Sequence, residues 1–175
     1  MHALVPFNLR PPHEPLPREL GNHFGLILLA LPVGVVDPVG RVNEVKRRMH
    51  VLKHSHEGAI SYGILELMGR TPPLIEARLI DFFSAKGSMV LTNVPGPRHT
   101  LSVAGTPLRG VLAWAPCSGS VGMSVSIFSY AGKVTIGFLT DAGLVPDPGA
   151  LADGFRAQLP AIARRARAPA QVPTA

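Results

Sequence analysis

Two stretches near the start of the chain have the apolar character of β-strands. The segment ALVPFNL, residues 3–9, and the unbroken apolar run Phe24–Leu31 both have strand length. A run that is apolar at every position is typical of a strand covered on both faces, so Phe24–Leu31 is predicted to be central in its sheet. The prolines within Pro11–Pro17 exclude a helix between the two strands.

Apolar residues then recur at spacings of three and four, which predicts helices. Asp37 and Pro38 form a helix start, with Asp as the N-cap and Pro at the first helical position. A second helix is predicted over 55–68, and Gly69 ends it. The apolar stripe of the first helix, predicted to pack on the core, consists of Val42, Val45, Met49 and Leu52.

Prolines mark the joints of two further helices. Pro72-Pro73 opens one helix, which is predicted to end at Lys86-Gly87. Asp147-Pro148 opens the last one, and Pro160 is predicted to kink it or end it early. From about residue 166 the composition predicts a disordered tail, 166–175. The apolar stripes are Leu74, Ile75, Leu79, Ile80 and Phe83 in the first helix, and Leu151, Phe155, Leu159 and Ile162 in the second.

Strict alternation of apolar and polar residues marks the clearest strands. Met123, Val125 and Ile127 alternate with serines, and alternation resumes after Ala131-Gly132, so an antiparallel hairpin with one face in the core is predicted. A further strand is predicted over 88–94, with weaker strand signals over 101–103 and 108–112. The order strand, strand, helices, strand, hairpin, helix predicts an α/β (α+β) fold with helices packed against a mixed sheet.

The strand over 88–94 runs into a corner with an unusual composition, Asn93-Val94-Pro95-Gly96-Pro97. Two prolines and a glycine in five residues are expected to forbid a regular ladder and to end the strand abruptly. Such a corner either punctuates the strand or holds a functional segment in a fixed geometry. The pattern alone leaves both interpretations open.

Length, charge and cysteine content narrow the class of protein. The 175 residues, 46% hydrophobic, suit one domain with a proper core. The net charge of +6 is spread over several segments with almost no aromatic residues between them, which argues against nucleic-acid binding. Cys117 is the only cysteine, so an intrachain disulfide is impossible. No secretory pattern and no apolar run of about 20 residues is present, so we predict a cytoplasmic protein, soluble or peripheral to a membrane.

Isolated polar residues offer weak candidates for chemistry. His50 and His54 lie one helical turn apart beside His56 and Glu57, which could place ligands around zinc, but a solvated helix face explains them better, and no metal is predicted. Cys117 has no base nearby in sequence, and Asp141 in LTDAG is typical of a turn that hydrogen-bonds its own backbone. No self-contained catalytic set emerges.

Six motifs in order resemble one family. They are NLRP at Asn8–Pro11, GN with its apolar strand at Gly21–Leu31, LPVGVVDPVGRV at Leu31–Val42, TNVPGP at Thr92–Pro97, SYAGKVTIGFLTD at Ser129–Asp141 and PDP at Pro146–Pro148. In this order they resemble the C-terminal half of the bacterial wax ester synthase/diacylglycerol acyltransferase family. The resemblance assigns residues 1–165 to that C-terminal lobe.

The resemblance implies one lobe of the chloramphenicol-acetyltransferase-like fold of CoA-dependent acyltransferases, in which substrates meet in a tunnel between two lobes. It implies acyl-CoA as a substrate, not a resident cofactor, and diacylglycerol or a fatty alcohol as acceptor, near a membrane or lipid droplet. The general base of the family belongs to a His-His-x-x-x-Asp-Gly motif of the N-terminal lobe. The segment HSHEG at His54–Gly58 does not match it, so the chain alone is predicted to be inactive, with no catalytic residue.

The resemblance gives the corner a role at the tunnel or lobe interface. Thr92, Asn93, Pro95 and Gly96 are then supporting residues, and Asn93 has both a donor and an acceptor to offer. The chain would be a domain fragment, a truncated gene product or part of a split enzyme that needs an N-terminal lobe. The alternative is a non-catalytic lobe that binds acyl chains or a partner.

A lobe that lacks its partner is expected to expose apolar surface and to self-associate. The segment LVPF, residues 4–7, and the stretch 108–114 are the predicted contributors, because neither has an obvious covering helix.

Overall fold

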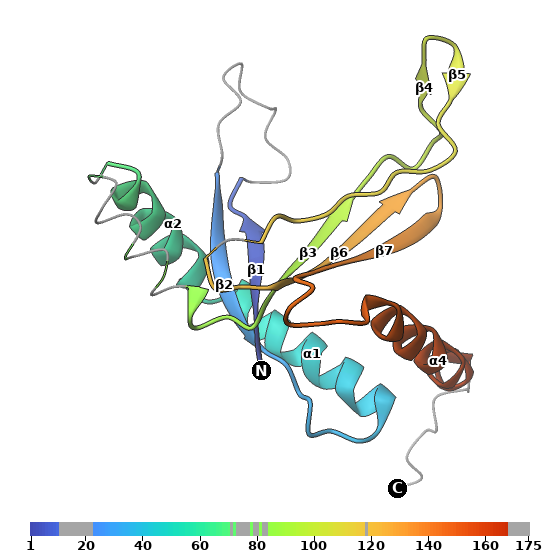
Figure 1. The fold of residues 1–175 in the computed structure, drawn as a ribbon, viewed down its shortest axis with the longest axis horizontal. Coiled ribbons are helices and arrows are strands. Elements are labelled where there is room, and N and C mark those ends of the chain that lie inside the picture. The colour runs from blue at the N-terminus through green and yellow to red at the C-terminus, as the bar shows by residue number, and fades with distance from the viewer. Residues whose placement is uncertain are drawn as a thin grey trace, which may run out of the picture.

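The structure is a computed structural model that describes residues 1–10, 23–70, 72, 78, 81, 84–117 and 119–167. The predicted connector Pro11–Pro17, most of the predicted helix after Pro72, and residues 168–175 of the predicted tail lie outside the described residues. Within the described part a five-stranded sheet forms the centre of the molecule, in the order β2-β1-β3-β6-β7 (Figure 1).

The sheet is mixed, as predicted. Strand β1 (His2–Asn8) pairs antiparallel with β2 (Phe24–Ala30) and parallel with β3 (Met89–Pro95). Strand β3 pairs parallel with β6 (Met123–Tyr130), which forms the predicted antiparallel hairpin with β7 (Lys133–Thr140). Helices α1 and α4 lie against one side of this sheet and α2 lies beside β2 (Figure 1).

Strand β2 is an edge strand, so the prediction that Phe24–Leu31 is central was wrong. Helix α2 (Glu57–Met68) covers its open edge, where the Leu26 N–H donates to Ser61 Oγ at 2.8 Å. The two backbones touch, because a Cβ on Gly25 would lie 2.0 Å from the Gly58 carbonyl oxygen. The helix thus buries an edge strand that would otherwise be exposed, which explains its uninterrupted apolar sequence.

The core lies between the sheet and α1 (Pro38–Lys53). Three of the four predicted stripe residues, Val45, Met49 and Leu52, pack on it, whereas Val42 is 48% exposed. The first turns of α1 extend past β1 toward α4 (Figure 1). The buried apolar residues of this core are Ala3, Val5, Ile27, Leu29 and Met89.

The predicted helix starts are confirmed by their caps. Asp37 Oδ2 accepts the Gly40 N–H at 2.7 Å at the start of α1, and Asp147 Oδ1 accepts the Ala150 N–H at 3.1 Å at the start of α4 (Pro148–Arg167). Helix α4 continues through Pro160, contrary to the predicted early end. Because Pro160 is exposed, water can bond the carbonyl that loses its partner.

A second hairpin, β4 (Ser102–Val103) with β5 (Thr106–Pro107), projects from the body of the molecule (Figure 1). Ala104 and Gly105 turn it with φ of 50° and 79°, close to the 47° and 77° of Ala131 and Gly132 in the β6–β7 turn. Positive φ at both central residues is the geometry of tight hairpin turns. The predicted strand at 101–103 is thus present, but 108–112 forms no strand.

The buried side chain of Tyr130 holds the base of this projecting hairpin. Its hydroxyl accepts the Leu101 N–H at 2.9 Å and donates to the Leu108 carbonyl at 3.0 Å. The Leu108 N–H also donates to the Leu101 carbonyl at 2.8 Å. One side chain therefore joins both arms of the hairpin to the main sheet.

The prediction of exposed apolar surface is right for one segment and wrong for the other. Leu112 and Trp114 are 61% and 55% exposed. In contrast, within LVPF Val5 is buried and Leu4, Pro6 and Phe7 are half-buried, because β1 is the second strand of the sheet. A strand at the very start of the chain is here part of the core.

Candidate functional site

Strands β1 and β3 diverge after a short pairing. Their ladder consists of Ala3 with Met89 and Leu4 with Val90, whereas the β3–β6 ladder continues to Pro95. In Figure 1 the ends of β1 and β3 point apart. From Leu91 onward, the side of β3 that faces β1 has no strand partner among the described residues.

Pro6 explains where the β1–β3 ladder stops. Pro6 is paired with Leu26, whose N–H points away from β1 to Ser61. In an antiparallel ladder, the backbone N–H and C=O groups of two opposed residues point either toward each other or both away from each other. Since the N–H of Leu26 points away from β1, the nitrogen of Pro6 points away from β2 and toward β3. The next bond after Leu4 would come from this nitrogen, which carries no hydrogen.

Pro95 lies on the opposite side of the same gap. The Gly96 N–H donates to the Ser129 carbonyl of β6 at 2.9 Å. Since successive N–H groups of a strand alternate in direction, the nitrogen of Pro95 faces the gap and costs the β6 ladder nothing. Strand β3 therefore runs through Pro95, one residue beyond the predicted end at residue 94, and the prediction that the corner forbids a regular ladder was wrong.

The corner after Pro95 is fixed by close backbone packing. A Cβ on Gly96 would lie 2.2 Å from the Ser129 carbonyl oxygen, so only glycine fits this position. The Ala131 N–H donates to the Pro97 carbonyl at 2.9 Å and ties the corner to the β6–β7 turn.

The four predicted site residues do not form one cluster. Asn93 has an exposed side chain with no hydrogen-bond partner among the described residues, and Pro95 is exposed beside it. Thr92 is half-buried on the opposite face of β3, opposite Ser126 of β6. Gly96 allows the corner to pack closely on the backbone of Ser129. Their role at a lobe interface stays a prediction.

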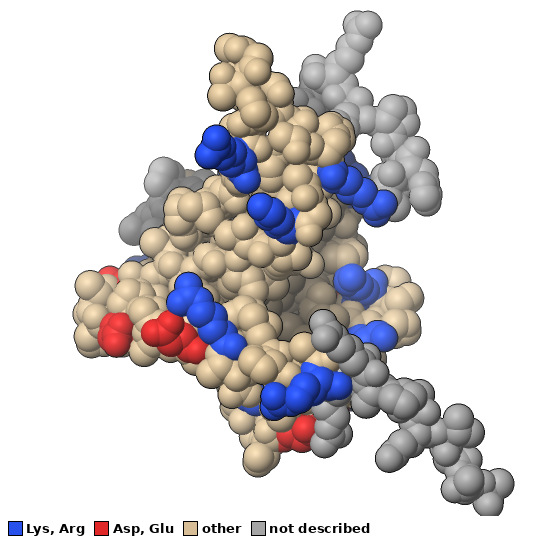
Figure 2. Space-filling model, turned by 90° about the vertical axis from the view of Figure 1, so that its right-hand side faces the viewer, with Lys and Arg blue, Asp and Glu red and all other residues tan. Residues whose placement is uncertain are grey.

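Positive charge surrounds this end of the sheet. Arg98, Arg109 and Lys133 are exposed, and each lies within two residues of the bonded positions Pro97, Leu108 and Ala131. No Asp or Glu occurs between Phe82 and Thr140 in the sequence. On the face shown in Figure 2, the upper part carries Lys and Arg side chains without Asp or Glu. This end therefore attracts anions.

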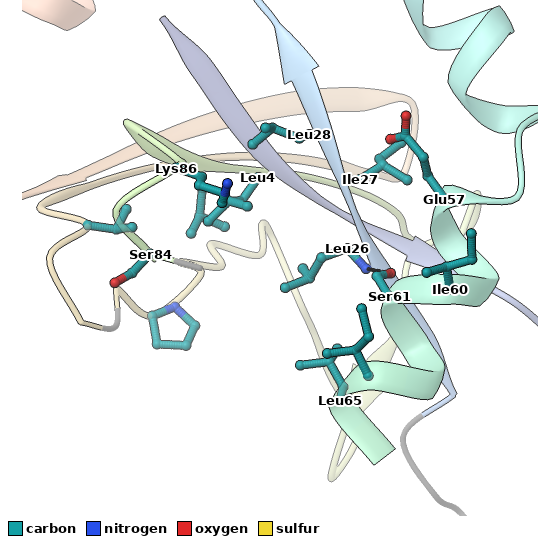
Figure 3. A pocket seen from close by; sticks show the side chains of 14 residues that line it. Leu4, Leu26, Ile27, Leu28, Glu57, Ile60, Ser61, Leu65, Ser84 and Lys86 are labelled. Carbon is teal, nitrogen blue, oxygen red and sulfur yellow. Dashed lines mark hydrogen bonds between the residues drawn. The ribbon is translucent and has the colours of Figure 1, made fainter. Parts of the chain in front are cut away.

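A second candidate site is an apolar pocket of about 430 Å³ on the sheet face opposite α1 (Figure 3). This volume lies within the range of small-molecule sites. Strands β1, β2 and β3 form one wall and α2 the other. The aliphatic lining residues include Leu4, Leu26, Leu28, Ile60, Ile64, Leu65 and Val90.

The hydroxyl groups of this pocket are already hydrogen-bonded. Ser61 Oγ accepts the Leu26 N–H and donates to the Gly58 carbonyl at 2.9 Å. Ser84, which is buried, donates to the Asp81 carbonyl at 3.1 Å and accepts from Ser120. The interior thus presents apolar surface, with the charged groups Lys86 and Glu57 on opposite sides (Figure 3).

Sequence reasoning missed this pocket. The sequence does indicate one wall of the pocket, because Ile60 and Ile64 of α2 are spaced by one helical turn and so lie on one face of the helix. The other wall is the second face of β1 and β2, which the sequence could not place opposite α2.

The remaining candidates fall into structural roles. Asp141 accepts the Gly143 N–H at 2.8 Å, which confirms the turn interpretation. The rings of His50 and His54 are 4.4 Å apart, and no three His, Cys, Asp or Glu side chains of the described part could hold a metal ion. The ring centroids of His23 and Tyr62 are 4.5 Å apart, so His23 packs on an aromatic ring. His99 is exposed.

Cys117 is half-buried and lines a hollow together with Asp141 and Leu144. Among the described residues that line this hollow no base is available to activate the thiol, because the carboxylate of Asp141 accepts hydrogen bonds within its own turn. In the helices of the described part, no segment is long and apolar enough to cross a bilayer.

The family model of the WS/DGAT C-terminal domain matches residues 20–163. The chain belongs to this family. This confirms the family resemblance, and five of the six motifs lie within the matched residues.

Several curated proteins align with the family member described here. The probable diacylglycerol O-acyltransferase tgs1 of Mycobacterium tuberculosis is 29% identical over 172 residues, which cover 94% of this chain and 37% of the relative. Wax ester synthase/diacylglycerol acyltransferase 8 of Arabidopsis thaliana is 29% identical over 79% of this chain and 29% of its own length. The chain thus spans about a third of the length of the curated relatives it matches.

A solved structure shares the fold. The wax ester synthase/diacylglycerol acyltransferase from Marinobacter aquaeolei VT8 superposes with a TM-score of 0.57 at 17% identity, over 92% of this chain and 37% of that one. The predicted fold class, a mixed sheet with flanking helices, is therefore confirmed, and it is shared with part of that structure.

Proposed function

We propose that this chain is the C-terminal lobe of an acyl-CoA-dependent O-acyltransferase that makes triacylglycerols or wax esters. Membership in the WS/DGAT C-terminal domain family carries this proposal. The relatives named as diacylglycerol O-acyltransferases and wax ester synthases are about three times as long, which leaves room for a second lobe.

In the proposed reaction the acceptor hydroxyl oxygen attacks the thioester carbonyl of acyl-CoA. The carbon–sulfur bond breaks, the ester forms, and the hydroxyl proton passes through a general base to the leaving thiolate. The family motif assigns that base to the N-terminal lobe. The contribution of this chain is to position the substrates, which in related chemistry accounts for a large part of the rate enhancement.

The rigid corner after β3 is part of this proposal. Gly96 and Pro97 fix the end of β3 against β6, and Asn93 presents an exposed amide beside it. We place Thr92, Asn93, Pro95 and Gly96 at the tunnel or lobe interface. In an active two-lobe enzyme, Asn93→Ala should then lower the rate more than the melting temperature.

Acyl transfer from palmitoyl-CoA to diacylglycerol or hexadecanol tests the proposal. The chain alone should give no product, because loss of a general base alone costs about 10²–10⁴-fold. A chimaera of the N-terminal part of tgs1 with this chain, compared with intact tgs1, should restore transfer. Turnover by the chain alone would refute the need for a second lobe, and His23, His99 and Asp141 would be the first residues to replace.

The apolar pocket favours a second candidate function, a lobe that binds acyl chains without catalysis. Ile64 lines the pocket, whereas Leu67 is 67% exposed on the same helix and does not line it. Ile64→Gln should weaken binding of the fluorescent fatty acid cis-parinaric acid, and Leu67→Gln should not. If the chimaera is inactive and this difference is seen, the non-catalytic lobe is the better description.

A further inference from the structure

We infer that the outer edge of β7 pairs with the β7 edge of a second copy of this chain, so that two five-stranded sheets join across a two-fold axis. The two β7 strands run antiparallel, because a two-fold axis perpendicular to the sheet reverses the strand direction. Strand β7 is the last strand of the sheet, at the side away from β2 (Figure 1). The inference concerns how the chain assembles and does not depend on the proposed reaction.

The outer side of β7 presents a row of backbone groups. The Asp141 N–H donates to the Gly122 carbonyl at 2.8 Å, so the backbone of Asp141 faces the β6 side. Because successive residues of a strand alternate in direction, every second residue counted back from Asp141 faces β6, and the residues between them face outward. No hydrogen bond from the described part of the chain reaches this outward row. The row consists of the N–H and C=O groups of Val134, Ile136, Phe138 and Thr140.

The usual means of protecting a sheet edge are missing from β7. The strand is eight residues long, contains no proline and carries one charge, Lys133, at its first position. Helix α4 contacts the face of β7 rather than its edge, since the ring of Phe138 packs on that of Phe155 with centroids 6.5 Å apart. At the other side of the sheet, α2 covers the edge of β2. A long edge without such cover is a template for another strand.

Charge selects the register of the pair. Lys133 begins β7, Asp141 directly follows its end, and both are exposed. In an antiparallel pair centred on Gly137, Lys133 of each copy lies opposite Asp141 of the other. The turn hydrogen bonds of Asp141 use Oδ1, so Oδ2 remains available for the ammonium group. A pair shifted by two residues would place Lys133 opposite Leu139 or Gly143 and would lose both ion pairs.

The same register brings the outward backbone groups together. Ile136 lies opposite Phe138 of the other copy, and Val134 lies opposite Thr140, so each of these residues can donate one hydrogen bond and accept one. Val134, which is 65% exposed in the single chain, gains a neighbour on the same face of the joined sheet.

Trp114 lies beside the centre of this interface. A Cβ on Gly137 would be 3.1 Å from Trp114 Nε1, so the indole ring lies next to the residue on the axis. The side chain is 55% exposed in the single chain. Pairing therefore brings the second copy close to this ring. Because Trp114 is the only tryptophan, its fluorescence reports on the pairing.

Sedimentation velocity and Trp114 fluorescence of the 175-residue chain test the interface. We expect a reversible equilibrium between monomer and dimer, and dilution should shift the emission to longer wavelength as the indole becomes more exposed. A monomer at every concentration would overturn the inference. A species that keeps growing with concentration would also overturn it, because two identical edges related by a two-fold axis form a closed pair.

A pair of variants at one position isolates the backbone contact. Val134→Pro removes an outward donor from each copy but keeps the β6 ladder, and extended Lys133 tolerates a following proline. We expect the Kd of the dimer to rise about tenfold, because two hydrogen bonds are lost. Val134→Thr keeps the donor and should leave the Kd nearly unchanged. Melting temperatures measured below the Kd verify that both variants fold, and an equal Kd for the two would overturn the inference.

The register is tested by charge. Lys133→Glu places like charges opposite each other twice per dimer, so the Kd should rise about three- to tenfold. Salt should weaken the dimer of the unmodified chain and strengthen that of this variant, because it screens attraction in the first and repulsion in the second. Lys46→Glu, on α1, is the matched control and should leave the Kd unchanged. The same Kd for the Lys133→Glu and Lys46→Glu variants would overturn the pairing centred on Gly137.

Discussion

The two ends of the sheet are built in opposite ways. Around β1 and β2 the backbones of strand and helix touch, at Gly25 and Gly58, and the core residues Ile27 and Leu29 are 1% exposed. Around the end of β3 the strands separate, the side chains are exposed and the charge is positive. The first region is dominated by packing, and the second region leaves backbone and charged groups available. Replacements in the first should therefore affect stability, and replacements in the second should affect binding.

The largest expected effect is in the core. Leu29→Ala should lower the free energy of unfolding by about 3 kcal/mol, because a buried leucine is lost and a cavity remains. Val103→Ala, in the projecting hairpin, should change it by less than about 0.5 kcal/mol. Urea denaturation of the two variants measures the difference, and similar losses would mean that the hairpin is packed against something in solution.

A smaller effect is expected where α2 touches β2. Gly25→Ala should cost about 1–3 kcal/mol, because the new Cβ forces strand and helix apart. Gly34→Ala is the matched control, since its Cβ would meet no atom within 4 Å. Thermal unfolding of both proteins decides whether the contact is as tight as described, and equal melting temperatures would contradict it.

Tyr130→Phe should loosen the open end without disturbing the core. The ring remains, but the two hydrogen bonds to Leu101 and Leu108 are lost, at a cost of about 1 kcal/mol. Hydrogen exchange should accelerate in 101–108 and stay unchanged in β1 and β2. Faster exchange throughout the sheet would instead assign Tyr130 to the core.

The smallest effect concerns a surface ion pair on α1. Arg47, followed by Arg48, lowers the pKa of Glu44 from 4.5 to about 2. Since the pKa is lowered in the folded chain, this stabilisation is present above pH 4.5 and is lost as the pH falls toward 2. Glu44→Gln should thus reduce the melting temperature slightly at pH 7 and not at pH 2, and salt should diminish the difference. A larger loss of melting temperature at pH 2 than at pH 7 would contradict the stabilisation by ionised Glu44.

Local patterns predicted most elements of this fold, because caps, turns and periodicity are properties of neighbouring residues. Asp37, Asp147 and Ala131-Gly132 have the predicted roles. The position of β2 could not be predicted, because an edge strand covered by a helix and a central strand bury the same residues. Only the tertiary contact between Gly25 and Gly58 separates these cases.

The candidate site depended even more on tertiary structure. The sequence drew attention to Pro95 and Gly96, but their meaning depends on which side of β3 faces β6. Pro6 has no special signal within its strand, and its position where the β1–β3 ladder stops emerges only from the strand order and register. The pocket likewise requires α2 to lie beside β2, which no local pattern specifies.

The short β1–β3 ladder also has a consequence for how the chain folds. The hairpin of β6 and β7 closes over a two-residue turn, whereas His2 and Ser88 at the β1–β3 junction are 86 residues apart in sequence. Closing so long a loop is slow, and its entropic cost is offset by only two residue pairs of the β1–β3 ladder. We therefore expect β3, β6 and β7 to assemble first, and their docking onto β1 and β2 to be the late, rate-limiting event.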